Sequence, residues 1–235
     1  RAHSSFWDLK PGDIDWDKIL EGVSWFHFSA ISSALNESLA NVCREGAEAA
    51  AKKGITVSVD LNYREKLWKY GKSPLEIMPS LVQYCDVIMG NLWAEEKMLG
   101  TYVPGEVKDE KQVYLDLSKK TSEDIMNKFP RCKQVANTFR FDRPGGLSYY
   151  ATLFTNDKLF VSKEYATNNV IDRVGSGDTF MAGLVYGNYK KLNPQDIIDF
   201  AAAAAFNKLF IIGDASTASV EDINKRIHEQ KKQGA

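Results

Sequence analysis

Short apolar runs alternate along the chain with longer stretches in which apolar residues recur every three or four positions. The short runs are rich in β-branched and aromatic residues and predict strands at residues 23–28, 55–61, 86–89 and 134–138. The longer stretches predict helices at residues 36–54, 75–84, 92–99, 111–129, 180–189, 194–209 and 220–230, with a loop at residues 29–33. Residues 147–154 and 158–161 predict a hairpin around Thr155-Asn156-Asp157. This alternation predicts an α/β fold.

Polar residues follow the second and third predicted strands directly. The first two strands are joined by one helix and a short link at Gly54, which implies a parallel, right-handed crossover. The second strand ends in Asn62-Tyr63-Arg64, and the third ends in Gly90-Asn91. Because open α/β sheets bind ligands at the carboxyl ends of their strands, Asn62, Arg64 and Asn91 are candidate binding residues.

The strongest chemical signal lies in residues 169–187, which read N-V-I-D-R-V-G-S-G-D-T-F-M-A-G-L-V-Y-G. A short apolar run ends at Ile171, and apolar residues return at helical spacing from Phe180, so we expect an extended segment to enter a helix through a glycine turn. Gly175 and Gly177 can adopt backbone angles that are closed to other residues. Together with the unpaired amides at a helix start, they predict an anion site suited to a phosphoryl group.

Asp178 places a carboxylate beside this predicted anion site. Such an acid suits an enzyme that takes a proton from a hydroxyl while it stabilises charge on the phosphoryl group under attack. The alternative is that Asp178 is a helix N-cap and the glycines form a tight turn. Asp172, in the same stretch, favours the reactive interpretation.

Composition and charge narrow the class of protein. The chain has 235 residues, 44% of them hydrophobic, which is enough for one substantial core. Its 30 basic and 31 acidic residues are mixed, giving a net charge of −1, so we expect neither nucleic acid nor a membrane as a partner. The scattered 3 cysteines and 3 histidines favour thiols in a cytoplasmic protein over disulfides or a zinc site. A homo-oligomer is compatible with this composition. The start at Arg1, without a methionine, suggests that the sequence is a fragment of a longer chain.

The string Asp172-Arg173-Val174-Gly175-Ser176-Gly177-Asp178 resembles the D-x-x-G-(A/S)-G-D signature of the ribokinase-like (PfkB) carbohydrate kinases. Within that family, Asp60-Leu61-Asn62-Tyr63-Arg64 with Leu67-Trp68, and the opening Arg1-Ala2-His3-Ser4-Ser5, are similar to sugar-site segments of 2-keto-3-deoxygluconate kinases. The resemblance covers essentially the whole chain. It implies a three-layer α/β/α fold with a mostly parallel sheet, of which residues 1–235 would be the C-terminal two-thirds of one kinase domain, without the N-terminal strands and lid.

The resemblance also implies roles for the candidate residues. Asp178 would be the base for the acceptor hydroxyl, and the amides of Gly175, Ser176 and Gly177 would hold the transferring phosphoryl group. Arg64, Arg1, Asn62 and Asp214 would contact the sugar acid, with the Arg64 guanidinium as a fork on a carboxylate or a phosphate. For Asp214, as for Thr138 and Arg140, ordinary loop structure is the competing expectation. The competing expectation for Arg64 is a solvated loop arginine.

ATP and Mg²⁺ are the implied cosubstrate and metal. Asn91, Thr138 and Arg140, with Gly175 and Gly177, would contact the nucleotide; Thr138 and Arg140 follow the fourth predicted strand, where the family has its nucleotide loop. The N-x-x-E element that organises Mg²⁺ in the family is imperfect here, because the acid comes one residue late, at Glu95. A solvated position on a helix face therefore competes with a metal-binding role for Glu95. We expect Mg²⁺ to arrive with ATP. Lys208 and Asn207 are candidate neighbours of the nucleotide, and a wet helix face is the competing expectation for both.

Three functional hypotheses follow. The first is an ATP-dependent kinase that phosphorylates 2-keto-3-deoxygluconate or a similar sugar acid at its C6 hydroxyl. The second is a kinase of the same fold for a neutral sugar such as ribose or fructose, which the arginines disfavour. The third is a catalytically silent fragment that binds only nucleotide or a partner.

Overall fold

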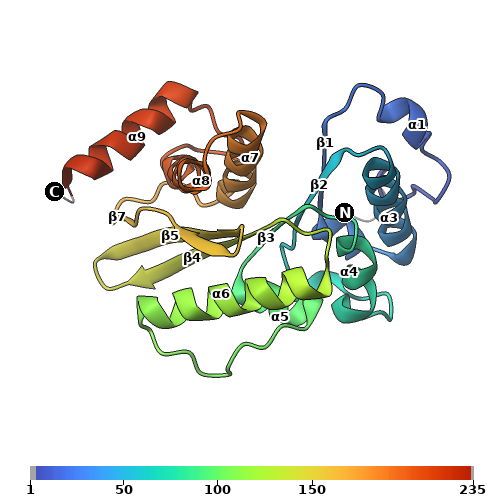
Figure 1. Cartoon of the computed structure of the whole chain (residues 1–235), viewed down its shortest axis with the longest axis horizontal. Helices are drawn as coiled ribbons and strands as arrows, with labels where there is room; N and C mark the ends of the chain where they lie inside the picture. Colours follow the sequence, from blue (N-terminus) through green and yellow to red (C-terminus); the bar gives the residue numbers. More distant parts are fainter. Residues whose placement is uncertain (1–3, 234–235) are drawn as a thin grey trace. The chain divides into compact units, whose positions relative to one another are not determined.

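The computed structural model describes residues 4–233, with side chains as far as Glu229 (Figure 1). The chain forms two compact units that divide after Ala136. The expectation that residues 1–235 belong to one kinase domain stays a prediction.

The first unit is built on three parallel strands, β1 (Trp25–Ser29), β2 (Thr56–Asp60) and β3 (Val87–Gly90). β2 pairs with β1 and with β3 in parallel, which confirms the predicted parallel arrangement of the first two strands. The helices of this unit are α1 (Trp16–Ile19), α2 (Ala30–Ser33), α3 (Glu37–Lys52), α4 (Pro74–Val82), α5 (Leu92–Leu99) and α6 (Lys111–Lys128), with a 3₁₀ turn at Glu65–Leu67.

The crossover helix α3 begins and ends where its sequence predicts. Asn36 caps it by accepting a hydrogen bond from the Leu39 amide at 2.8 Å, and Gly54 follows it in a left-handed conformation. Its buried face carries leucine, valine and small residues that pack toward β1 and β2. A capped amphipathic helix of this kind fixes the position at which β2 enters the sheet.

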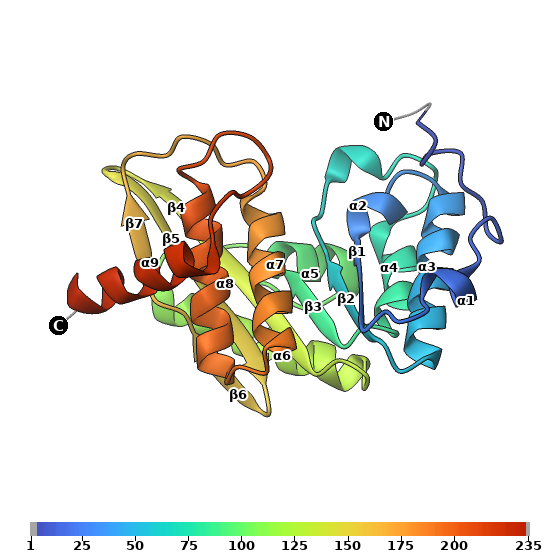
Figure 2. The same cartoon turned by 90° about the horizontal axis from the view of Figure 1, so that it is seen from above.

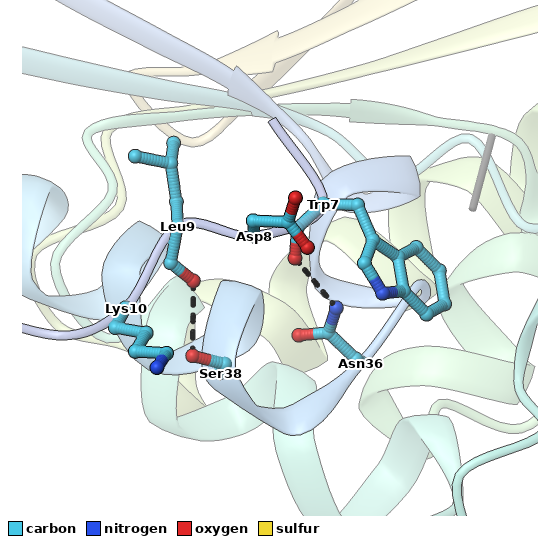
Figure 3. Close-up of a pocket in the computed structure, with 6 residues that line it drawn as sticks. All are labelled: Trp7, Asp8, Leu9, Lys10, Asn36 and Ser38. Carbon is cyan, nitrogen blue, oxygen red and sulfur yellow. Dashed lines mark hydrogen bonds between the residues drawn. The ribbon is translucent and has the colours of Figure 1, made fainter. Parts of the chain in front are cut away.

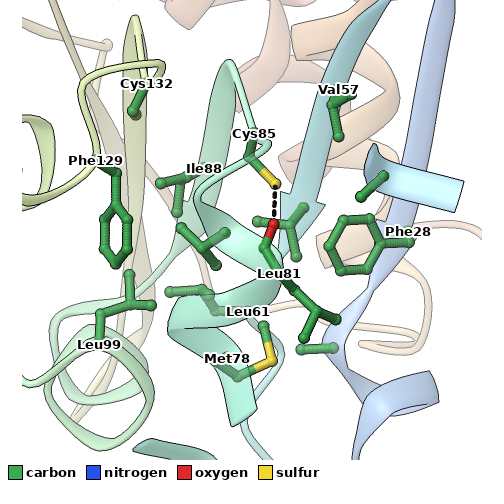
Figure 4. Packing of buried hydrophobic residues seen from close by; sticks show 14 of the residues in the cluster. Phe28, Val57, Leu61, Met78, Leu81, Cys85, Ile88, Leu99, Phe129 and Cys132 are labelled. Atoms are coloured by element: carbon green, nitrogen blue, oxygen red, sulfur yellow. Dashed lines mark hydrogen bonds between the residues drawn. The ribbon is translucent and has the colours of Figure 1, made fainter. Parts of the chain in front are cut away.

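The core of the first unit closes around β2 (Figure 4). Val57 and Val59 are fully buried, as is Ser58 between them, so both faces of the strand are covered. Met78 from α4 and Ile88 from β3 pack into the same cluster. Burial of both faces is typical of a parallel sheet covered by helices.

The second unit contains the hairpin that the sequence predicts. The C-terminal part of β5 (Gly146–Thr155) pairs antiparallel with β6 (Lys158–Val161), and its N-terminal part pairs antiparallel with β7 (Tyr165–Thr167). Asn156 and Asp157 form the turn with φ values of 51° and 59°. A two-residue type I′ hairpin turn requires such positive φ values at both positions. β4 (Gln134–Arg143) precedes this hairpin and is longer than predicted.

The helices α7 (Ser176–Tyr189), α8 (Pro194–Lys208) and α9 (Val220–Gln233) complete the second unit. α7 and α8 lie side by side (Figure 2), and α8 also contacts β5, β6 and α9. An added Cβ at Gly183 of α7 would lie 2.6 Å from the Cα of Ala201 in α8. Small residues therefore let the two backbones approach closely, and α7 carries the glycine-rich stretch at its start.

Replacing Gly183 by alanine should lower the free energy of unfolding. Overpacking costs about 1–3 kcal/mol, which exceeds the gain of about 1 kcal/mol in helix propensity. Urea denaturation measures the difference. Gly177→Ala is the matched control for stability, because Gly177 lies in the same helix and an added Cβ there meets nothing within 4 Å. Equal stability changes in both variants would contradict the packing argument.

Two expectations for local structure are wrong. Residues 30–33 form the short helix α2 where a loop is expected, with the Ser29 hydroxyl accepting from the Ile31 amide. α7 begins at Ser176, four residues before the predicted start, so the glycine turn is its first turn. The extended segment before it, residues 169–173, forms no strand. Within residues 4–233, the helices lack the length and apolar content needed to cross a bilayer.

Candidate active site

The start of α7 brings together the backbone groups that the sequence predicts as an anion site. Gly175 is the N-cap residue, with φ 76° and ψ 0°, and Ser176 opens the helix. The first amides of a helix have no intrahelical acceptor and lie at the positive end of its dipole. Gly177 therefore presents its N–H group at a positively polarised helix end, which suits an anion, whereas the Ser176 amide also donates to the Arg173 carbonyl at 3.4 Å.

Gly175 packs directly against the loop that follows α8. A Cβ added at this position would overlap the carbonyl oxygen of Asp214. The left-handed φ and this close approach both require glycine. The backbone of Asp214 thus packs against the glycine turn at Gly175, which is the predicted phosphoryl loop, and Asp214 itself is exposed.

The carboxylate of Asp172 joins the same two loops by hydrogen bonds. Its Oδ1 accepts from the Val174 amide and its Oδ2 from the Gly213 amide, both at 2.9 Å. These bonds, together with the positive charge of Lys208, lower the pKa of Asp172. Because the folded-state pKa lies below the ordinary value, the carboxylate keeps the loops joined at neutral pH and loses this stabilising role only as the pH falls through the lowered pKa.

Side chains in the first turn of α7 hold it against α8. The buried hydroxyl of Ser176 donates to the carbonyl of Ala205 at 3.1 Å, and the hydroxyl of Thr179 donates back to Gly175 at 2.8 Å. The Ser176 side chain is therefore committed to packing. Its predicted contribution to ligand binding rests on its backbone amide.

Asp178 is exposed in the first turn of α7. The N-cap is Gly175, so the alternative interpretation of Asp178 as the N-cap is wrong. The Asp178 carboxylate lies in the same helical turn as the first amides of α7 and is exposed to solvent. It can accept a proton from a hydroxyl that reaches this turn, which is the geometry a general base needs.

Thr138 and Arg140 lie within β4, not in a loop after it, because the strand continues to Arg143. Thr138 is half-buried and Arg140 is exposed. Two residues further along the strand, Asp142 accepts two hydrogen bonds from Arg173, at 2.9 Å and 2.6 Å. This bidentate pair, which lowers the pKa of Asp142, ties the segment before the glycine turn to β4.

The other candidates lie in the first unit, at the ends of β2 and β3. Asn62 has φ 27° and donates its amide hydrogen to Asp60 at 2.9 Å, which turns the chain sharply after β2. Arg64 follows with an exposed side chain that donates to the Tyr63 carbonyl. Asn91 is exposed and caps α5 by accepting from the Ala94 amide at 2.9 Å. Arg1 lies outside the described residues.

Two polar side chains are buried where the sequence predicts wet helix faces. Glu95 in α5 and Lys208 in α8 are both 0% exposed, so that expectation is wrong for each. Asn207, next to Lys208, is half-buried and accepts from Arg226. A signal for both was present in the sequence, because Glu95 shares a helix face with Leu92 and Leu99, and Lys208 shares one with the alanines of α8.

A hollow of about 490 Å³ lies in the first unit between the N-terminal segment and α3 (Figure 3). Its lining is Trp7, Asp8, Leu9, Lys10, Asn36 and Ser38. The side chains of Asn36 and Ser38 donate to the carbonyls of Trp7 and Leu9, at 3.3 Å and 3.0 Å. These hydrogen bonds hold the segment against α3. Among the described residues, none of the predicted site residues lines the hollow.

No group of three or more His, Cys, Asp and Glu side chains able to hold a metal ion occurs among the described residues. Glu95 is enclosed, and both oxygens of Asp172 accept backbone hydrogen bonds. The described residues therefore do not fit a resident metal centre. A Mg²⁺ ion that travels with a nucleotide needs few protein ligands and is compatible with this arrangement.

Comparison with known proteins gives one family. The sequence model described as pfkB family carbohydrate kinase matches residues 7–217. The crystal structure of 2-dehydro-3-deoxygluconokinase from Thermotoga maritima is 34% identical, superimposes with a TM-score of 0.86, and is matched over 97% of this chain and 67% of that chain.

More distant relatives are similar in the same way. The structure of a putative 2-keto-3-deoxygluconate kinase from Enterococcus faecalis, 23% identical, has a TM-score of 0.82 over 97% of this chain and 66% of that chain, which supports the fold alone. A curated relative, 2-dehydro-3-deoxygalactonokinase of Haloferax volcanii, is 23% identical over 96% of this chain, which spans 63% of that relative's length. The predicted ribokinase-like α/β fold is confirmed.

Proposed function

Because this chain belongs to the pfkB family of carbohydrate kinases, we propose that it transfers the γ-phosphoryl group of ATP to the C6 hydroxyl of 2-keto-3-deoxygluconate or a closely related sugar acid. The observation that carries this proposal is the first turn of α7. There an exposed carboxylate, Asp178, stands among the first amides of a helix that Gly175 opens in a left-handed conformation. Kinase chemistry needs both a base and a charge-stabilising cradle.

In the proposed reaction Asp178 accepts the proton of the acceptor hydroxyl. The freed oxygen forms a bond to the γ-phosphorus, the bond from that phosphorus to the β,γ-bridging oxygen breaks, and ADP leaves. The amides of Ser176 and Gly177 stabilise the charge on the transferring group. Mg²⁺ enters as part of the MgATP substrate, and Asn91, Thr138, Arg140 and Asp214 stay candidates for nucleotide or sugar contacts.

The acidic class of substrate is supported by Arg64. A guanidinium donates two parallel hydrogen bonds to a carboxylate, and Arg64 is exposed after the sharp turn at Asn62. The structures to which the chain is similar include a 2-dehydro-3-deoxygluconokinase, whose name specifies a sugar acid. A neutral sugar would leave this guanidinium without its partner.

An ADP-release assay across a panel of sugars tests the proposed function. We expect turnover with 2-keto-3-deoxygluconate or its galactonate epimer and at least about tenfold lower kcat/KM for ribose and fructose, because the carboxylate contact is lost. Equal rates on fructose would overturn the sugar-acid assignment. A folded chain that binds ATP and turns over none of these sugars would overturn the kinase proposal in favour of a silent binding protein.

Arg64→Met should raise the KM for the sugar acid by about 10-fold to 100-fold, since a charge-assisted hydrogen bond contributes about 1.5–3 kcal/mol. The KM for ATP and the rate on neutral sugars should not change. Lys66→Met is the matched control, because it removes an exposed positive charge from the same loop. A similar loss in both variants would assign the effect to general charge instead of a specific contact.

We also propose that the protein works in the cytoplasm, where ATP is available and thiols stay reduced. Cys43, Cys85 and Cys132 are free and buried. Burial raises the pKa of Cys43 to about 11 and that of Cys132 to about 12, so both stay protonated and unreactive. Three inert core thiols are typical of proteins from a reducing compartment.

A further inference from the structure

Lys208 is a buried charge that the proposed reaction does not use. It stands in the last turn of α8 and is 0% exposed. Removing an ammonium group from water is costly unless the protein supplies compensating partners. An apolar side chain would continue the alanine-rich face of α8 without this cost, so the position of Lys208 requires a reason.

The ammonium group of Lys208 holds the chain that leaves α8. Its Nζ donates to the carbonyl oxygen of Ile211 at 2.8 Å. The last carbonyls of a helix carry partial negative charge, and a cation there is stabilising. One of these late carbonyls, that of Leu209, accepts from the amides of Ile171 and Asp172, at 2.9 Å and 3.1 Å.

These contacts connect Lys208 with the phosphoryl loop. The Asp172 carboxylate receives hydrogen bonds from Val174 and Gly213, and the positive charge of Lys208 contributes to its lowered pKa. Gly213 lies two residues after Ile211, the residue that Lys208 holds, and Asp214 packs on Gly175. The cation therefore favours the ionised Asp172 that joins the two loops and also fixes one of those loops directly.

We infer that Lys208 is a positioning residue for phosphoryl transfer: its buried ammonium group orders residues 209–214 and, through Asp172, the amides at the start of α7. This inference rests on the proposed function for its catalytic consequence. Its structural part concerns only the order of the two loops. Lys208 does not touch substrate in this role, so its loss should lower kcat more than it affects sugar binding.

Lys208→Met tests the inference, with Lys225→Met on the exposed face of α9 as the matched control. We expect kcat to fall by about 10-fold to 100-fold, as for other small displacements of a reacting group, while the KM for the sugar acid stays within about threefold. Amide hydrogen exchange should accelerate at Val174 and Gly213 and stay slow in the middle of α7 and α8. Unchanged exchange and unchanged kcat in a folded Lys208→Met variant would overturn the inference.

Asp172→Asn gives a second, independent arm that does not depend on the folding of Lys208→Met. It should lower kcat and accelerate exchange at the same two amides. Unchanged kcat and unchanged exchange in Asp172→Asn would overturn the inference. In the double variant, Lys208→Met should add little to the loss of kcat already caused by Asp172→Asn, since both act on one loop junction. If the unmodified chain shows no kinase activity, the proposed function fails, and the exchange rates alone decide the role of Lys208.

Discussion

Replacing Asp178 by asparagine is expected to lower kcat by about 10²-fold to 10⁴-fold, the range that a positioned general base contributes. Asparagine has nearly the same shape but cannot accept the hydroxyl proton. The binding of MgATP, measured by calorimetric titration, should stay the same or tighten slightly, because a negative charge is removed from beside the predicted phosphate cradle. The variant therefore separates the loss of chemistry from the loss of binding.

The stability of Asp178→Asn distinguishes a reactive carboxylate from a structural one. Asp178 is exposed, and Gly175 occupies the N-cap, so the free energy of unfolding should fall by at most about 1 kcal/mol, the value of a favourable interaction with the helix dipole. Urea denaturation measures this difference. A loss of several kcal/mol with retained turnover would contradict the assignment of Asp178 as the base.

The chain offers a matched control for this substitution. Asp196 occupies the third position of α8, as Asp178 does in α7, and both of its groups bind the side chain of the N-cap residue Asn193: the Asp196 carboxylate accepts from Asn193 Nδ2, and the Asp196 amide donates to Asn193 Oδ1. Asp196→Asn should leave kcat unchanged. An equal loss of activity in both variants would mean that any carboxylate at a helix start matters, and not the one beside the glycine turn.

The elements that the sequence predicts correctly are those whose local signals agree with their packing. The capping of α3 by Asn36 and the turn at Asn156-Asp157 depend on neighbours in the sequence, and the structure confirms both. The D-x-x-G-S-G-D string also carries a local signal, since Gly175 adopts the left-handed conformation that its glycine permits and α7 begins directly after it. The catalytic roles of Gly175 and Asp178 stay predictions.

The predictions that failed depend on contacts between distant segments. Periodicity did not reveal that α7 starts at Ser176, because a glycine-rich turn has a low helix propensity and is held in the helix by the bonds of Ser176 and Thr179. Charge alone predicted exposure for Glu95 and Lys208, and tertiary packing overrides it in both. The link from Asp172 to Gly213 crosses 41 positions of the chain, which no local pattern encodes.

Gly175→Ala should have the largest effect on the folded structure near the site. Alanine at φ 76° costs about 1–2 kcal/mol, and its Cβ overlaps the carbonyl of Asp214, so the two loops must separate. We expect the free energy of unfolding to fall by about 2–4 kcal/mol and kcat to fall with it, because the amides at the start of α7 lose their position. Urea denaturation and the ADP-release assay measure the two losses.

Two further glycine variants separate the causes of that effect. Gly213→Ala, at φ 92° with nothing within 4 Å of the added Cβ, suffers the backbone strain without the overlap, so it should lose less stability than Gly175→Ala. Gly177→Ala also meets nothing within 4 Å and has no left-handed φ, so it should keep its stability. If the phosphoryl group approaches this backbone closely, Gly177→Ala should still lose turnover. Full activity in Gly177→Ala would place the phosphoryl group elsewhere, and a stability loss in Gly213→Ala equal to that in Gly175→Ala would show that strain, not contact with Asp214, makes glycine necessary.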